Sequence, residues 1–452
     1  IQDVAQKYLR DNGVTVALVV PKFDAPATQT AAAPTSAPTE SAAKMIRLDN
    51  GLRVLLRPSK GAPTVSVVLT GLGGVRTEAP NQAGVANFAA QLLERGTAKR
   101  SAEQIAQLVD DLGGSMSTFS GYNSWGIESQ WLASDWKRGL NLVAESALSP
   151  TFPAEEVEKV RAQLLGAIAA RDDDPMSASG ALLRRLFYAN HPYARQTLGT
   201  EAAVKALSKS QIEAFWRATL QPSRSVLAIY GDFQLADAEK AARFLFGSWK
   251  PQTASLPGAP QVVSPPSFTS KIQNQDGITQ SVLFYGFPSI AIADADRHAI
   301  DVLDAALSGA ALPGGRLHAK LRDNELVYVV HAYNSPGIDG GMFVVYAATT
   351  PQNRAKARTI IEEEIERMRA EPISEAELER AKSMMISARA IDLQTNSSQA
   401  RDAASNELFG LGYADGATYA EKINAITRED VQRVAAKYLE KERAALAIVE
   451  PK

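Results

Sequence analysis

Residues 431–452 read VQRVAAKYLEKERAALAIVEPK, and residues 1–22 read IQDVAQKYLRDNGVTVALVVPK. The two stretches align without a gap, and their identities include Tyr8 with Tyr438 and Pro21 with Pro451. A third copy, SQIEAFWRATLQPSRSVLAIYGDF, occupies residues 210–233. Each copy combines an amphipathic helical pattern, a short polar turn and an apolar strand pattern. The sequence therefore predicts repeated units that end in the same helix and strand.

This repeat also predicts how the chain is divided. One helix and one strand cannot bury their own apolar faces, so we expect residues 1–22 to complete a preceding repeat of a longer protein. Residues 23–44 are rich in Pro, Ala, Thr and Ser and have the composition of a linker. We predict a first unit at residues 45–247, a second linker at 248–266 and a second unit at 267–452.

Local signals within the units favour mixed secondary structure. Asp49-Asn50-Gly51 separates two strand-like runs and predicts a hairpin turn. In residues 101–114, Ser101 and Gln104 suit a helix capping box and Gly113 suits the helix end. Strands and helices do not alternate strictly in either unit. We therefore predict an α+β fold of two homologous units, each a mainly antiparallel sheet flanked by helices.

Composition narrows the functional classes. The 452 residues include 48 Lys and Arg against 50 Asp and Glu, a net charge of −2 that does not indicate nucleic-acid binding. The absence of cysteine excludes disulfides, thiolate metal sites and a cysteine nucleophile. Because no apolar run approaches 18 residues, we expect no membrane span. The lack of cysteine fits the bacterial periplasm, which we expect, and also a cytoplasm.

Four stretches occur in an order that resembles the pitrilysin/insulinase family of zinc peptidases. They are LDNGLRVLLRPSKGAPTVSVVLTGLGGVRTEAPNQAGVANFAAQLLERGT at residues 48–97, SPTFP at 149–153, HPYAR at 191–195 and GGRLHAKLRDNELVYVV at 314–330. The similarity extends over residues 45–452 and implies the two-unit fold of that family.

The same resemblance locates a zinc motif that this chain has lost. The family uses His-x-x-Glu-His on a helix, with two histidine ligands, a glutamate base and a further glutamate ligand on a later helix. The matching residues here are Asn87, Ala90 and Gln91, and the later ligand matches Ala167, with Val160 one helical stretch earlier. Carboxamides are poor zinc ligands and alanine accepts no proton. The four histidines of the chain show no metal-ligand spacing, so we expect no zinc and no hydrolysis from this chain alone.

A second family element is retained. Arg322 and Tyr328 match an Arg and a Tyr that reach the active site from the half without zinc, which implies hydrogen bonds to the substrate carbonyl and the tetrahedral intermediate. Their spacing here is one residue shorter than in many relatives. The alternative is a helix-end arginine that binds carbonyl groups and a half-buried strand tyrosine. Arg316 and His318 are weaker candidates for the same pocket, and the Gly-rich residues 308–315 are expected near a substrate backbone.

These expectations combine into one functional hypothesis. The chain is a zinc-free, non-catalytic half that binds unfolded peptide and completes the chamber of a homologous, zinc-bearing half. That partner lies upstream in the same polypeptide or in a separate subunit, and zinc is expected only there. The alternative is a structural scaffold related to the peptidases, without a substrate. A third possibility, serine-type catalysis, finds no G-x-S-x-G motif.

Overall fold

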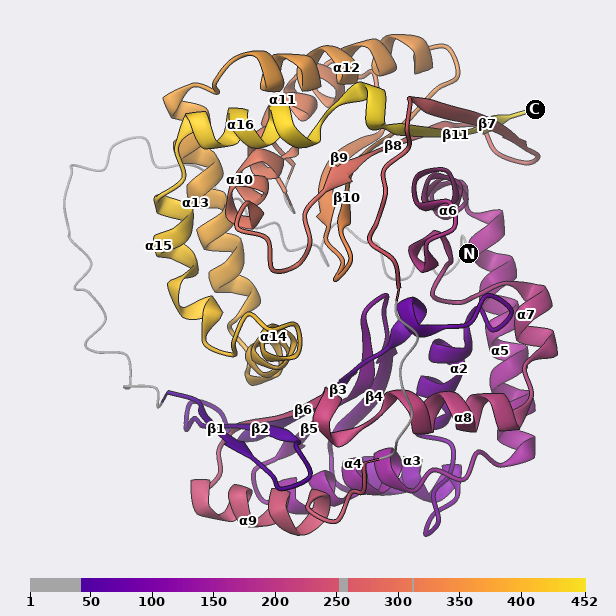
Figure 1. The fold of residues 1–452 in the computed structure, drawn as a ribbon, viewed down its shortest axis with the longest axis vertical. Helices are drawn as coiled ribbons and strands as arrows, with labels where there is room; N and C mark the ends of the chain where they lie inside the picture. The colour runs from indigo at the N-terminus through magenta and orange to yellow at the C-terminus, as the bar shows by residue number, and fades with distance from the viewer. Residues whose placement is uncertain (1–41, 252–258, 311–312) are drawn as a thin grey trace, which may run out of the picture. The chain divides into compact units, whose positions relative to one another are not determined.

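The computed structural model describes residues 42–251, 259–310 and 313–452. The predicted tail at residues 1–22 and nearly all of the linker at 23–44 lie outside the described residues. The described strands form two sheets with helices around them (Figure 1), so the predicted α+β class is confirmed. Among the described residues, no helix is long and apolar enough to cross a membrane.

The first sheet has the strand order β1-β2-β6-β3-β5-β4. Only β2 and β6 run parallel; all other neighbours are antiparallel. The Asn50 side chain fixes the predicted hairpin turn between β1 and β2, because it accepts from the Leu52 N–H and donates to the Phe246 and Trp249 carbonyls. The strands are β1 Lys44–Arg47, β2 Arg53–Pro58, β3 Thr64–Leu72, β4 Ser115–Ser120, β5 Ser124–Leu132 and β6 Ser225–Gly231.

The second sheet repeats this topology. Its order is β7-β11-β8-β10-β9, and only β7 and β11 run parallel. If β1 is set aside, both sheets place their strands in the chain order first, fifth, second, fourth, third. The strands are β7 Thr269–Gln275, β8 Ser281–Ser289, β9 Val329–Ser335, β10 Gly341–Thr349 and β11 Ala445–Pro451.

The helices cover both faces of each sheet. The first sheet and its helices make up the first part of the chain, residues 42–251, and the second sheet and its helices make up the second part, residues 259–310 and 313–452. Those of the first part are α2 Val85–Leu92, α3 Ala102–Asp111, α4 Trp136–Leu148, α5 Ala154–Asp173, α6 Pro175–Tyr188, α7 Glu201–Ala206, α8 Lys209–Thr219 and α9 Leu235–Phe246. Those of the second part are α10 Arg297–Ser308, α11 Gly315–Leu317, α12 Arg354–Ala370, α13 Glu375–Asp392, α14 Asn396–Leu408, α15 Tyr419–Asn424 and α16 Arg428–Tyr438. The expected capping box of α3 is present at Ser101 and Gln104. The two described repeat copies form helix α8 with strand β6 and helix α16 with strand β11.

The two parts exchange helices. Helix α6 of the first part packs on strands β8 and β11 of the second sheet, and α14 of the second part packs on β3 and β6 of the first (Figure 1). Small residues at helical spacing, Ala400, Ala403 and Ala404, let α14 lie close to the sheet residues Val68 and Ala228. The far faces of the sheets bury separate cores against their own helices. The exchange therefore makes each sheet depend on a helix from the other part.

A buried ion pair also connects the two parts. Arg76, just after β3, donates from Nε and Nη2 to the Asp339 carboxylate at 2.5 and 2.9 Å. The Asp339 side chain is 3% exposed, and His191 lies 3.7 Å from the same carboxylate. The same ring nitrogen of His191, Nε2, lies 2.9 Å from the carbonyl oxygen of Pro260, which belongs to the described end of the second linker.

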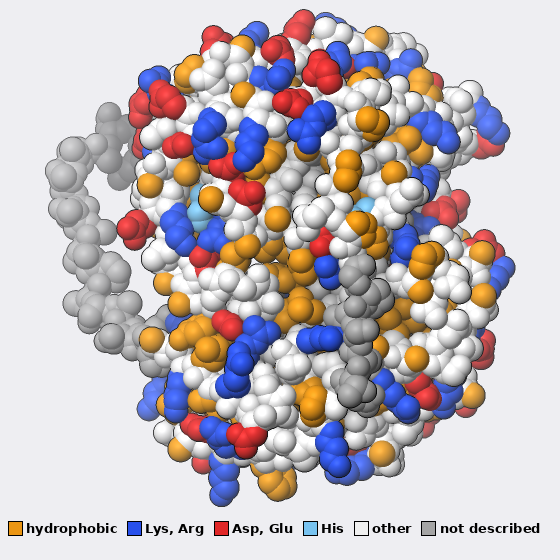
Figure 2. All heavy atoms as spheres, in the orientation of Figure 1, with side chains coloured by type: hydrophobic (Ala, Val, Ile, Leu, Met, Phe, Trp, Pro, Cys, Tyr) orange, Lys and Arg blue, Asp and Glu red, His pale blue; other side chains and the backbone are white. Residues whose placement is uncertain are grey.

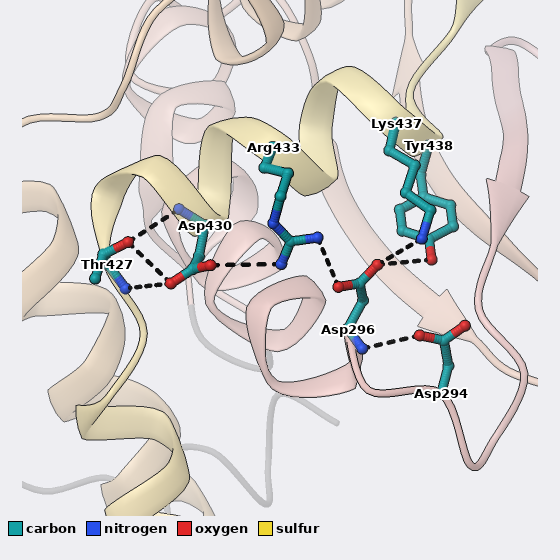
Figure 3. Close-up of polar contacts among 7 residues, drawn as sticks. All are labelled: Asp294, Asp296, Thr427, Asp430, Arg433, Lys437 and Tyr438. Carbon is teal, nitrogen blue, oxygen red and sulfur yellow. Dashed lines mark hydrogen bonds and ion pairs between the residues drawn. The ribbon is translucent and has the colours of Figure 1, made fainter.

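Helix α16 is attached to the start of α10 by a single carboxylate. Asp296 accepts hydrogen bonds from Arg433, Lys437 and the Tyr438 hydroxyl at 2.7, 2.8 and 2.9 Å (Figure 3). Burial opposes ionisation of Asp296, but the bonds from Lys437, Arg433 and Tyr438 outweigh it and lower the pKa to about 2. The repeated helix is thus held in place by electrostatics as well as by its apolar face.

Candidate functional site

Helix α2 carries the positions that match the lost zinc motif. Its start is fixed by Glu78, whose carboxylate accepts the backbone N–H groups of Gly84 and Ala86, each at 3.1 Å. Burial raises the Glu78 pKa to about 7, while the two backbone donors act in the opposite direction. The helix that carries the motif is therefore retained and capped.

The side chains on α2 do not form a zinc ligand set. Gln91 donates from Nε2 to the Asn87 Oδ1 at 2.6 Å, so the two carboxamides bind each other across one helical turn. Ala90 is 2% exposed and offers only a methyl group to its buried surroundings. Neutral amides and a methyl group supply neither the imidazoles nor the general base that zinc chemistry requires. The residues present at these positions do not fit the zinc ion that the resembled family binds.

The fourth matching position lies on α5, which packs beside α2. Val160 and Ile168 are buried against the core, whereas Ala167 is exposed on the helix surface. Arg161 joins the two helices, with its guanidinium 5.2 Å from the centre of the Phe88 ring. The structure therefore brings α2 and α5 together as the resemblance implies, without a donor atom on the Ala167 side chain.

One glycine of the Gly-rich residues before the second candidate site packs against the chain itself. Gly315 has φ +71°, and a Cβ there would lie 2.6 Å from the backbone of residues 307–308. This close approach requires glycine. The glycine therefore lets the chain fold back on the end of α10, a role that the sequence argument for a substrate contact did not include.

Arg322 ends a π-helical turn, His318–Arg322. The wide turn is closed by the bond from the Asp323 N–H to the His318 carbonyl at 3.0 Å. Such turns are rare and are frequent at functional sites. The Arg322 side chain is exposed, and its Nη1 lies 3.3 Å from the Val327 carbonyl oxygen. The alternative interpretation of Arg322, an arginine that binds carbonyl groups at a helix end, expects this kind of contact. Because the contact is long and involves one nitrogen, most of the guanidinium donors stay available.

Tyr328 directly follows Val327 and precedes β9. Its backbone N–H bonds to the Ala348 carbonyl at 2.8 Å, while its side chain is 51% exposed. Arg322 thus contacts the residue next to Tyr328. The two side chains differ in setting, because Arg322 lines a pocket and Tyr328 is not among the residues that line it.

That pocket lies between α10, α13 and the turn that contains Arg316 and Arg322. Its volume is about 490 Å³. Arg316 forms a double hydrogen bond with Glu377 of α13, from Nε at 2.6 Å and from Nη2 at 3.2 Å. The described lining residues are Ala305, Ala306, Pro313, Gly314, Gly315, Arg316, His318, Ala319, Arg322, Asp323, Glu377, Arg380, Ala381 and Met384. The structure therefore confirms that Arg316 and His318 share a pocket with Arg322.

His318 lines this pocket with a mostly buried imidazole. Burial lowers its pKa, and its ring centre lies 4.8 Å from that of His331, whose pKa burial also lowers.

The contribution of α13 to the pocket was not predictable from the sequence. The only signal there is the capping box of Ser374 and Glu377, which predicts a helix start and says nothing of its neighbours.

The face of the molecule that Figure 2 draws has no dominant charge. Figure 2 shows acidic and basic side chains interspersed over the face that it draws, in line with the net charge of −2. Electrostatic recognition therefore depends on local groups such as the arginines of the pocket.

Two family models match the chain one after the other. The model described as insulinase (peptidase family M16) matches residues 53–201, and the model described as the peptidase M16 inactive domain matches residues 206–385. The chain belongs to the M16 peptidase family. The predicted resemblance to pitrilysin and insulinase is thereby confirmed.

Relatives of this M16 chain match it over most of their length. An uncharacterized zinc protease of Mycobacterium leprae is 28% identical over 410 residues, which are 89% of this chain and 90% of the relative. The uncharacterized zinc protease YmxG of Bacillus subtilis is 26% identical over 418 residues, or 90% of this chain and 98% of the relative.

Two solved structures share the fold. A protease from Helicobacter pylori superposes with a TM-score of 0.85 at 19% identity, over 91% of this chain and all of that one. A peptidase M16 inactive domain from Pseudomonas fluorescens gives a TM-score of 0.83 at 21% identity, over 91% and 98% of the two chains. At these identities the likeness concerns the M16 fold alone.

Proposed function

We propose that this chain is the non-catalytic, zinc-free half of a two-part M16 zinc metallopeptidase. The observation that carries the proposal is the contrast on α2. The helix, its Glu78 cap and its packing on α5 are retained, while Asn87, Ala90 and Gln91 offer no zinc ligand or base. Such a chain serves an enzyme by completing the site of a zinc-bearing homologous half.

The contribution of this half is to hold the substrate. Arg322 and Tyr328 present a guanidinium and a phenol at the surface, where they can hydrogen-bond a peptide carbonyl and the oxyanion formed at the partner's zinc. Strands β4 and β9 each end a sheet among the described strands, and a sheet edge can take an extended peptide as a further strand. The substrate class that this arrangement favours is unfolded peptide, recognised through its backbone.

The test measures zinc content and hydrolysis of a quenched fluorogenic peptide. The chain is assayed alone, then mixed with a zinc-bearing M16 half, with Arg322→Ala and Tyr328→Phe as variants. Arg138→Ala is the matched control, because Arg138 is 62% exposed and, among the described residues, forms an ion pair only with Asp135 at the first turn of α4. We expect activity only in the mixture, with a fall of about 10²-fold in kcat for Arg322→Ala, as for loss of one oxyanion donor.

Two results would contradict the proposal. Zinc-dependent hydrolysis by the chain alone would show that it is itself the enzyme. Partner activity that is the same with and without this chain, and with both variants, would support the scaffold alternative.

A further inference from the structure

The pocket between α10, α13 and the Arg316–Arg322 turn has more positive charge than a hydrogen bond from Arg322 to a peptide carbonyl requires. Three of its lining residues are arginines: Arg316, Arg322 and Arg380. Its lining carboxylates are Glu377 and Asp323. What the pocket can bind therefore depends on which of these charges are already paired.

Glu377 is fully engaged within the protein. Both of its oxygens accept from Arg316, and one also accepts the Ser374 N–H and hydroxyl at 2.9 and 2.7 Å. The bond from Arg316, together with these donors, lowers the Glu377 pKa to about 2. Glu377 is thus a fixed anion that neutralises Arg316 and caps α13. It has no charge left for another arginine.

The other two arginines have no carboxylate partner among the described residues. Arg380 follows Glu377 by one turn of α13, is exposed, and forms no ion pair or hydrogen bond with any described residue. Arg322 has only its 3.3 Å contact with the Val327 carbonyl. Asp323 lies at the same pocket but within 4.0 Å of neither guanidinium. Two guanidinium groups therefore face this pocket with unused donors.

The remaining wall of the pocket is apolar. Ala305 and Ala306 of α10 and Ala381 and Met384 of α13 line it beside the arginines. The volume of about 490 Å³ lies within the range of pockets that bind small ligands. A guanidinium matches a carboxylate through two parallel hydrogen bonds, and small apolar residues suit an aliphatic side chain. A ligand with one oxyanion beside an apolar group satisfies both parts of the wall.

We propose that this pocket binds the C-terminal carboxylate of a peptide through Arg380, at the pocket that Arg322 also lines, with the last side chain against the alanines of α10 and α13. The proposal rests on the peptide-binding role proposed above and adds a requirement for a free C-terminus. Free phosphate has related oxyanion chemistry and is distinguished from carboxylate by the experiment.

The experiment measures the affinity of the full chain for two fluorescent peptides by anisotropy. Both end in leucine; one has a free carboxylate and the other a C-terminal amide. We expect the carboxylate peptide to bind about 10-fold more tightly, which corresponds to about 1.4 kcal/mol. Arg380→Ala should reduce this ratio to near one, Arg380→Lys should keep part of it, and Arg138→Ala, at a 62% exposed arginine of α4, should leave it unchanged.

The outcomes separate this proposal from the preceding one. Equal affinity for the two peptides, or a ratio that Arg380→Ala does not change, overturns the carboxylate site while peptide binding itself stands. Equal affinity together with displacement of both peptides by millimolar inorganic phosphate assigns the pocket to phosphate and also overturns it. If neither peptide binds, both proposals fail. Because Arg380 is exposed and unpaired among the described residues, its replacement should not unfold the chain.

Discussion

Replacing Asp339 with asparagine should show how much the ion pair between the two parts contributes to the stability of the fold. Asp339 is 3% exposed and accepts two hydrogen bonds from Arg76, whose side chain is 19% exposed. The Arg76 pKa is raised, chiefly by its hydrogen bond with Asp339, which indicates that the charged pair is favoured in the folded state. In Asp339→Asn the shape of the side chain is kept and its charge is lost. A mostly buried guanidinium is then left without a counter-charge.

The expected cost follows from this burial. Breaking a buried ion pair on one side destabilises a protein by about 3–5 kcal/mol. Since Arg76 keeps some solvent contact, the lower end, about 3 kcal/mol, is expected. Against a typical total stability of about 5–15 kcal/mol this is a large fraction. The measurement is urea denaturation followed by circular dichroism, with tryptophan fluorescence as a second probe.

Two further variants make the result decisive. Asp237→Asn removes a carboxylate of similar geometry, 2.8 Å from Lys137, at a pair whose side chains are 50% and 58% exposed. It should leave the denaturation curve unchanged, because exposed pairs contribute little. The double variant Arg76→Met with Asp339→Leu should recover much of the loss, since no charge is then left buried. A loss in Asp339→Asn no larger than in Asp237→Asn would refute the reasoning.

Four other predictions concern two acidic residues and two glycines. In Asp296→Asn, the part of the stability loss between about pH 4 and 2 that is due to Asp296, about 1 kcal/mol after solvent screening, should be absent, measured by denaturation of wild type and variant across that range. Burial raises the Asp304 pKa to about 7, so the wild type should lose stability as pH rises from about 4 to 7; Asp304→Asn should lose less over that range and be more stable than the wild type at pH 8 by roughly 2–4 kcal/mol. Gly139→Ala should lower the thermal midpoint at a cost of about 1–3 kcal/mol, because its Cβ would lie 2.2 Å from the buried ring of Trp131. Gly166→Ala, in α5 with no atom within 4 Å of the new Cβ, should raise stability by about 0.5–1 kcal/mol.

Local signals predicted the elements well where one short interaction decides them. The bond of the Leu52 N–H to Asn50, the Ser101 capping box and the Gly113 helix end are formed by residues a few positions apart, so local sequence predicts them. The bonds from Asn50 to the Phe246 and Trp249 carbonyls are distant in sequence and were not predicted. The family motifs at residues 48–97 and 314–330 likewise placed the lost zinc positions on a helix and Arg322 near Tyr328. The tail at residues 1–22 and its place in a longer protein stay predictions.

What the sequence did not indicate depends on contacts between residues that are far apart in the chain or in its loops. The place of residues 308–315 near a substrate stays a prediction, whereas the contact of Gly315 with the backbone of residues 307–308 was not expected. The pairing of Arg322 with Tyr328 also stays a prediction, and the pocket that Arg322 shares with Arg380, 58 positions later in the chain, was not expected. Nothing in the sequence around Glu377 and Arg380 indicates that α13 would lie against the Arg316 turn.

The sequence by itself determined the fold class, the repeated helix and strand, and the absence of ligands and base at Asn87, Ala90 and Gln91, because these depend on residue types at fixed short spacings. Only the tertiary structure decided that α6 and α14 exchange sheets, that Asp339 meets Arg76, and that Arg380 joins the pocket of Arg322. The physical reason is that these contacts depend on how amphipathic elements far apart in the chain bury their faces against one another, and one apolar stripe does not specify its partner.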